Sequence, residues 1–120
     1  MADNDDSLAV KIEEIRQMFL QRIRDEWLMR LSDLRRKLTG EWDRAMLEDL
    51  LFLTHTLAGS GATFGYKAIS DVALKVEIAT RAIIRGETGA AAEALAEILQ
   101  GLELLEGESR KALVDLRTPS

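Results

Sequence analysis

The 120-residue sequence contains no cysteine and only one histidine. Without cysteine there are no disulfide bonds, no thiol catalysis and no cysteine-based zinc site, and one histidine cannot form a histidine cluster for a metal. No apolar run approaches the roughly 18 to 20 residues that cross a bilayer. The first residues, Met1 to Asp6, are acidic where a signal peptide is basic. These absences predict a cytoplasmic protein that does not insert into a membrane.

Acidic side chains outnumber basic ones, and the formal net charge is −5. Such a field repels a phosphate backbone, so a nucleic acid is not expected as a partner. The length allows one domain with a single core. We expect an acidic lead at 1–6, a single helical domain at 7–117 and a short tail at 118–120. A start at Met1 suits a stand-alone protein and equally a fragment of a longer one.

The apolar residues follow a helical period through most of the chain. From Leu8 to Leu38 they recur at steps of three and four without an intervening glycine or proline, which predicts an amphipathic helix. At about 1.5 Å per residue this helix is roughly 45 Å long, longer than a bundle of this size needs. A kink, or a separate first helix near Ile12 to Phe19, is therefore an alternative.

Three further helices are predicted after this one. One begins at the cap Asp43 and ends at Gly65, one runs from about Tyr66 to Arg85, and one starts near Ala90 with Thr88 as its cap. No alternating strand pattern is present. The expected fold is all-α, an antiparallel up-down-up-down four-helix bundle with an extended or additional N-terminal helix.

One run, His55 to Tyr66, contains the single histidine and three of the eight glycines. Met46, Leu50, Leu53 and Leu57 mark the buried stripe of this helix, and on their register His55 falls on the exposed side. Small and apolar residues surround it on the helix surface, which leaves room for a large partner. These neighbours are Leu51, Phe52, Ala58, Gly59 and Ala62.

Two familiar glycine motifs do not fit this run. Gly59 and Gly61 lack the third glycine of a dinucleotide-binding loop, no Lys-Ser or Lys-Thr follows them, and no strand precedes them. A nucleophile elbow around Ser60 is also excluded, because Ala58 and Ala62 stand where its glycines belong. The glycines therefore do not predict a nucleotide site or a hydrolase.

The run resembles the signature of the histidine-containing phosphotransfer (HPt) domain. That signature is His-x-Leu-Lys-Gly-Ser, followed by small residues and a glycine that ends the helix. The matching positions are His55, Leu57, Gly59, Ser60 and Gly65. The segment Ala62–Tyr66 also resembles the version found in the phosphoacceptor domain of chemotaxis histidine kinases. The resemblance extends from about Ile15 to Leu105.

The resemblance implies roles for individual residues. His55 is the expected phosphoacceptor, and Glu77 stands twenty-two residues later, where the family places a Glu or Gln that hydrogen-bonds the imidazole. Such a carboxylate accepts from Nδ1–H and leaves the Nε2 lone pair as the nucleophile. The family lysine is replaced by Ala58, so Lys67 or Lys75 is a candidate for the missing cation. Ser60 is assigned to the phosphoryl neighbourhood and Gly65 to a structural role.

The implied function is that of a phosphorelay intermediate rather than a self-sufficient enzyme. His55 accepts a phosphoryl group from a receiver-domain aspartate and passes it to another receiver aspartate. The expected partners are response-regulator receiver domains and a sensor or hybrid histidine kinase, and the chain itself is expected to be a monomer. No cofactor or metal is expected in this chain, so Mg²⁺ would come from the receiver.

The small residues Ala58, Gly59 and Ala62 would let the receiver approach the imidazole, and Leu51 and Phe52 would offer apolar contact. Two other functions remain open. The chain could be the phosphoacceptor domain of a histidine kinase, phosphorylated from ATP by a separate catalytic domain. It could also be a helical adaptor or dimerisation module in which His55 has no chemical role.

Overall fold

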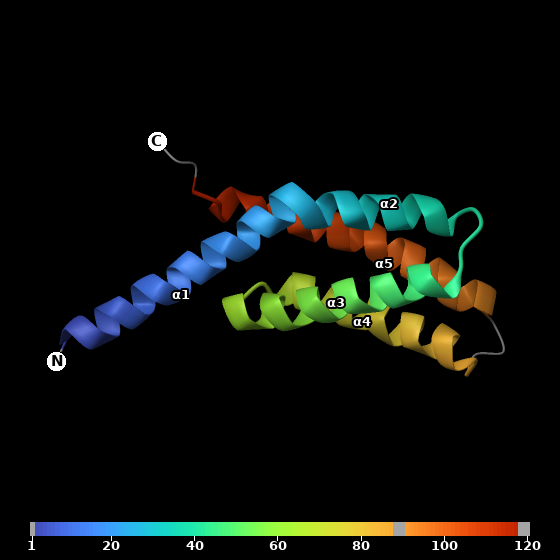
Figure 1. The fold of residues 1–120 in the computed structure, drawn as a ribbon, viewed down its shortest axis with the longest axis horizontal. Coiled ribbons are helices and arrows are strands. Elements are labelled where there is room, and N and C mark those ends of the chain that lie inside the picture. Colours follow the sequence, from blue (N-terminus) through green and yellow to red (C-terminus); the bar gives the residue numbers. More distant parts are fainter. Residues whose placement is uncertain (1, 88–90, 118–120) are drawn as a thin grey trace.

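The computed structural model describes residues 2–87 and 91–117, with side chains from Ser7 onward. Within these residues the chain is helical and has no strand. Helices α2 to α5 run alternately up and down and form the expected antiparallel four-helix bundle (Figure 1). The elements are α1 (Ala2–Arg22), a π turn (Ile23–Trp27), α2 (Leu28–Leu38), α3 (Arg44–Phe64), α4 (Lys67–Arg85), α5 (Ala91–Ala112) and a 3-10 turn (Leu113–Asp115). Thr88, the expected cap of the last helix, lies outside the described residues, as does the tail 118–120.

The N-terminal helix is continuous from Ala2 to Leu38, and its irregularity lies at the π turn rather than near Ile12 to Phe19. The spacing of the buried residues explains why the π turn lies at this point of the helix. Phe19, Ile23, Trp27 and Leu31 are four residues apart, and each such step advances by about 40° around a helix of 3.6 residues per turn. The π turn has i→i+5 hydrogen bonds and so takes up an additional residue. All four side chains are therefore buried on the same side of the helix.

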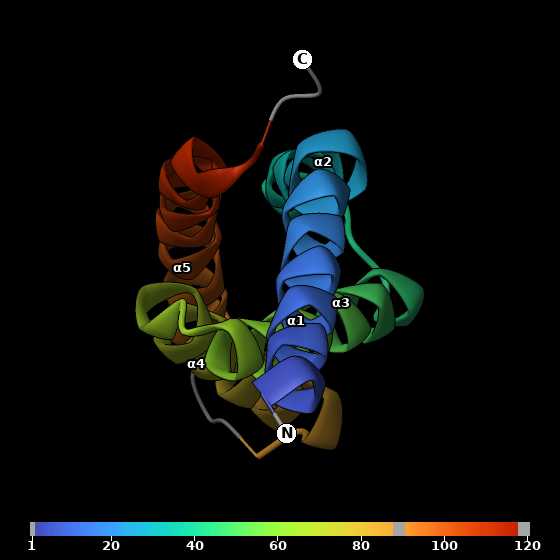
Figure 2. The same ribbon diagram turned by 90° about the vertical axis from the view of Figure 1, so that its left-hand side faces the viewer.

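Helix α1 extends beyond the end of the bundle (Figure 1). Viewed along the bundle, α2 to α5 surround a common interior and α1 runs out of it toward the N-terminus (Figure 2). The apolar stripe of this helix is consequently buried only from Phe19 onward. Leu8, Ile12 and Ile15 remain 59%, 50% and 52% exposed because none of the described helices covers them. The acidic residues that we expected to precede the domain form the first turns of α1.

Helix α1 is fixed to the bundle through Tyr66, which lies between α3 and α4. Arg16 Nη1 donates to the Tyr66 hydroxyl at 2.6 Å, and that hydroxyl donates to Asp115 near the C-terminus at 2.9 Å. The Phe19 ring contacts the rings of Phe64 and Tyr66, with centroids 5.4 and 5.9 Å away. Burial, together with the bond to Asp115, raises the pKa of the Tyr66 phenol. One cluster thus joins three segments that are distant in the sequence.

Helix α3 begins and ends where local rules predict. The Asp43 carboxylate accepts from the Met46 N–H at 2.9 Å and caps the first turn. At the other end Gly65 adopts φ = 85°, a left-handed conformation that reverses the chain into α4 at little cost for glycine. Leu50, Leu53 and Leu57 are buried as predicted, which turns the opposite side of α3 to the outside.

Helices α3 and α4 approach closely at Gly61. A Cβ atom at this position would lie 3.0 Å from the Ser70 backbone N and 3.1 Å from the Tyr66 carbonyl O, so only glycine fits without displacing backbone atoms. Gly59, two residues earlier, has nothing within 4 Å of the equivalent position. The two glycines therefore have different roles: Gly61 sets the distance between the helices, and Gly59 lies at an open surface.

We expect Gly61→Ala to lower the free energy of unfolding by about 1 to 2 kcal/mol, because overpacking against backbone outweighs the gain in helix propensity. The matched control is Gly59→Ala, for which we expect a rise of up to about 1 kcal/mol. Urea unfolding followed by circular dichroism measures both. A loss of the same size in the two variants would show that the close approach at Gly61 is not the cause.

Candidate functional site

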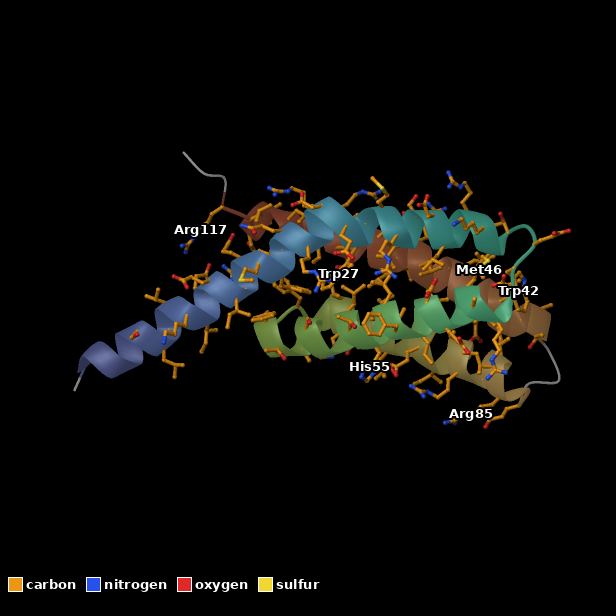
Figure 3. All side chains as sticks on the ribbon, in the orientation of Figure 1. Trp27, Trp42, Met46, His55, Arg85 and Arg117 are labelled. Carbon is orange, nitrogen blue, oxygen red and sulfur yellow. The ribbon has the colours of Figure 1, made fainter. Side chains whose placement is uncertain are left out.

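His55 stands on the outer surface of α3 (Figure 3). Its side chain is 74% exposed, because the buried stripe of Leu50, Leu53 and Leu57 lies on the other side of the helix. The imidazole is therefore accessible to another macromolecule while the helix that carries it is fixed in the core. The register of the apolar residues predicted this placement.

Glu77, on the neighbouring helix α4, contacts the imidazole of His55. His55 Nδ1 lies 3.2 Å from Glu77 Oε1 and 3.4 Å from Oε2. The Glu77 side chain is 9% exposed, so the carboxylate is held between the two helices rather than in solvent. A carboxylate can only accept a hydrogen bond, so the contact requires the proton on Nδ1. In the neutral ring the lone pair is then on Nε2, the nitrogen farther from Glu77.

Arg81, one turn further along α4, shares the same carboxylate. Its Nη2 donates to Glu77 Oε2 at 3.0 Å, and its side chain is 40% exposed. A guanidinium has five N–H donors, so most of them stay available for an anion near the imidazole. Sequence reasoning missed this residue. Its signal was the four-residue spacing from Glu77, which pairs side chains on a helix surface.

The surface of α3 just after His55 is formed by small residues. Gly59 and Ala62 are exposed, and Ala58 is partly buried against the core. The Ala58 carbonyl accepts from Ser70 Oγ of α4 at 2.8 Å, which ties this turn to the neighbouring helix. Because a Cβ at Gly59 would meet nothing, packing inside the domain does not require glycine there. No long side chain of this turn covers the imidazole.

Apolar side chains flank the imidazole on both helices. Phe52, on α3 just before His55, is 67% exposed, and Leu51 beside it is partly buried. On α4, Leu74 is 48% exposed and lies two turns before Arg81, hence on the same side of that helix. An accessible histidine between exposed apolar residues is typical of a docking surface.

The other residues assigned to the phosphoryl neighbourhood lie elsewhere. Lys67 forms an ion pair with Asp71 at 2.5 Å in the first turn of α4, and Lys75 lines a groove between α4 and α5. Ser60 is half-buried on α3. Among the described residues, none of the three bonds to His55 or Glu77; the cation that bonds to Glu77 is Arg81.

Residues 2–87 and 91–117 contain neither a cluster of metal ligands nor a membrane-spanning helix. Within these ranges no group of three or more His, Cys, Asp or Glu side chains is placed to hold a metal ion. None of the described helices is long and apolar enough to cross a membrane.

Comparison with known protein families identifies a match over most of the chain. The model of a family described as "Hpt domain" matches residues 14–113. No curated protein matches the chain, and no solved structure does. The matched range includes His55, Glu77 and Arg81, together with all of α2, α3, α4 and α5.

Proposed function

Because the chain belongs to the Hpt domain family, whose members transfer phosphoryl groups through a histidine in phosphorelays, we propose that His55 is the phosphorylated residue. It accepts the group from an aspartyl phosphate of one receiver domain and passes it to an aspartate of another. The observation that carries this proposal is an exposed imidazole whose Nδ1 faces a buried carboxylate.

The chemistry of the site supports transfer in both directions. The Nε2 lone pair attacks phosphorus, the bond from phosphorus to the aspartate oxygen breaks, and the carboxylate leaves. The product ring has a proton on Nδ1 and the phosphoryl group on Nε2, so it carries a positive charge that the Glu77 carboxylate stabilises. In the second step another aspartate attacks phosphorus, the P–N bond breaks, and His55 leaves as neutral imidazole.

The remaining requirements would be met by Arg81 and by the partner. The phosphoryl group carries negative charge that needs cations, and we expect the receiver to supply Mg²⁺. Arg81 is the candidate in this chain for a contact with the phosphoryl oxygens, since Ala58 occupies the family's lysine position. Leu51 and Phe52 would contact the receiver, while Gly59 and Ala62 would leave space for its loops.

The donor of the phosphoryl group decides between this function and its alternatives. Wild-type protein is incubated either with phosphorylated receiver domains or with a histidine kinase catalytic domain and labelled ATP. We expect rapid labelling from the receiver, in an acid-labile and base-stable form. Labelling only from the catalytic domain would favour the phosphoacceptor domain of a kinase. Absence of label in both reactions would favour an adaptor.

We expect Arg81→Gln to slow transfer from a phosphorylated receiver about fivefold, because a charge pair at this exposure contributes up to about 1 kcal/mol. Arg81→Lys should recover part of the rate, since it keeps the charge but not the planar donors. The control is Arg85→Gln, one turn further along α4, whose partner is Glu87. Single-turnover labelling measures the rates. Equal rates for Arg81→Gln and the control would remove Arg81 from the phosphoryl contact.

A further inference from the structure

A second surface lies between α4 and α5, on the flank of α4 that faces away from Glu77. It is an open groove with a volume of about 790 Å³. Its base consists of small or buried residues, Val76, Ala79 and Gly101 among them, and its walls include Ile78 and Leu104. These two wall residues are 60% and 54% exposed, although both are large and apolar.

The groove follows from the close approach of the two helices at Gly101. A Cβ atom on Gly101 would lie 2.4 Å from Val76 Cγ2, so the Val76 side chain packs directly on the α5 backbone. Ala79 of α4 and Ala94 of α5 are too small to fill the space beside this contact. The depression is therefore fixed by two packed helices and does not depend on a mobile loop.

The groove and His55 are on different sides of α4. Glu77 and Arg81 face α3 and the imidazole, whereas Lys75, Ala79 and Ala82 face α5 and line the groove. A molecule bound in the groove would leave His55 open. The two surfaces can therefore be occupied at the same time.

The rim of the groove is acidic at one end. Glu93 and Glu97 stand one turn apart on α5, and neither forms an ion pair with another described residue. The helices are antiparallel, so the C-terminal end of α4 and the N-terminal end of α5 meet here. Their opposite partial charges offset each other, and Glu93 and Glu97 set the sign of the field. Lys75 is the basic residue among those that line the groove. This field attracts a cationic ligand and opposes an anionic membrane or a nucleic acid.

We propose that the groove binds an amphipathic helix of a partner protein, with basic residues beside its apolar stripe. The lining of α4 extends from Val72 to Ala82, a length of about 15 Å, or three helical turns. Apolar residues of the partner at i, i+3, i+4 and i+7 would fit between Ile78 and Leu104, and its lysines or arginines would reach Glu93 and Glu97. Such a partner would hold the domain without competing at His55.

A second copy of this chain is a poorer occupant. Its exposed apolar helix is α1, with Leu8, Ile12 and Ile15. Glu14 adjoins that stripe and would meet the acidic rim of the groove, whereas Glu13 is already paired with Arg16 and Arg117. Charge complementarity therefore favours a basic helix from another protein.

The test uses a synthetic amphipathic peptide of about 18 residues, with leucines in the i, i+3, i+4, i+7 pattern and lysines beside them. Its matched control has glutamates in place of the lysines. We expect the basic peptide to bind at least about tenfold more tightly by fluorescence anisotropy. Amide NMR shifts should then map to the α4 and α5 residues of the groove. The experiment measures peptide binding only, so its result does not depend on whether His55 transfers a phosphoryl group.

Two variants locate the bound peptide. Ile78→Asp combined with Leu104→Asp should weaken binding at least about tenfold, because it places charge in the apolar walls. Phe52→Asp, an equally exposed apolar site near His55, should leave binding unchanged. Circular dichroism confirms that each variant is folded. The proposal is overturned if the basic peptide does not bind, if Phe52→Asp weakens binding equally, or if the groove shifts arise from dimerisation of the chain without peptide.

Discussion

His55→Gln should take up no phosphate from a phosphorylated receiver that labels the wild-type protein within the same time. Glutamine is similar in length and remains polar, but it has no nitrogen lone pair that can attack phosphorus. The fold should persist, because the His55 side chain is 74% exposed and surface substitutions usually change stability by less than about 0.5 kcal/mol. Gel electrophoresis of labelled protein gives the uptake, and circular dichroism gives the stability.

The matched control is Ser60→Ala, which removes a nearby hydroxyl on the same helix. It should retain the label, and the wild-type label should be lost in acid and stable in base, as expected for a phosphoramidate. Equal uptake by His55→Gln and wild type would exclude His55 as the acceptor. Loss of uptake in Ser60→Ala together with an acid-stable label would point to a serine phosphate instead.

The second large effect is expected at Glu77. Glu77→Ala removes the acceptor of the His55 Nδ1–H and the negative charge beneath the ring. Transfer should slow about 100-fold, a size typical of a group that sets proton positions in a reaction. Glu77→Gln should slow it less, because the amide oxygen still accepts from Nδ1–H although the charge is lost. Single-turnover labelling from a phosphorylated receiver measures the three rates.

Slow transfer in Glu77→Ala has two explanations, a changed tautomer of His55 or a disturbed fold. Only the first predicts a change in the position of the proton on the imidazole. Long-range ¹⁵N–¹H spectra of the imidazole should show the Nδ1–H tautomer in wild type and in Glu77→Gln, and a loss of that preference in Glu77→Ala. Thermal unfolding detects any change in the fold. If Glu77→Ala kept both the wild-type rate and the wild-type tautomer, Glu77 would be an ordinary acid between two helices.

The two central residues of the site were predicted from the sequence, His55 by helix periodicity and Glu77 by the family resemblance. The spacing of Leu50, Leu53 and Leu57 turned His55 outward, and the left-handed Gly65 ended α3 where expected. Glu77 was assigned from the family resemblance, which places a Glu or Gln twenty-two residues after the histidine, and its Oε1 lies 3.2 Å from His55 Nδ1. Each of these predictions depends on neighbours along the chain or on a motif of fixed spacing.

Features that depend on packing between helices were harder to predict. Arg81 can be identified as a residue of the site only once Glu77 is known to contact the imidazole. Periodicity placed Leu8 and Ile12 in the apolar stripe but could not show that none of the described helices packs against them. Likewise the side of α4 on which Lys75 lies follows from the packing of α4 against α5, which the sequence of α4 alone does not specify.

The π turn at Ile23–Trp27 makes the direction of α1 depend on the number of residues in that turn. If this turn became α-helical with no residue removed, the preceding part of the helix would rotate by about 100° around its axis. Phe19 would then leave Phe64 and Tyr66, and Leu8 would point to another side of the molecule. Substitutions in α1 would change which side chains this helix presents, whereas loss of the π turn would change the side of the molecule on which it presents them.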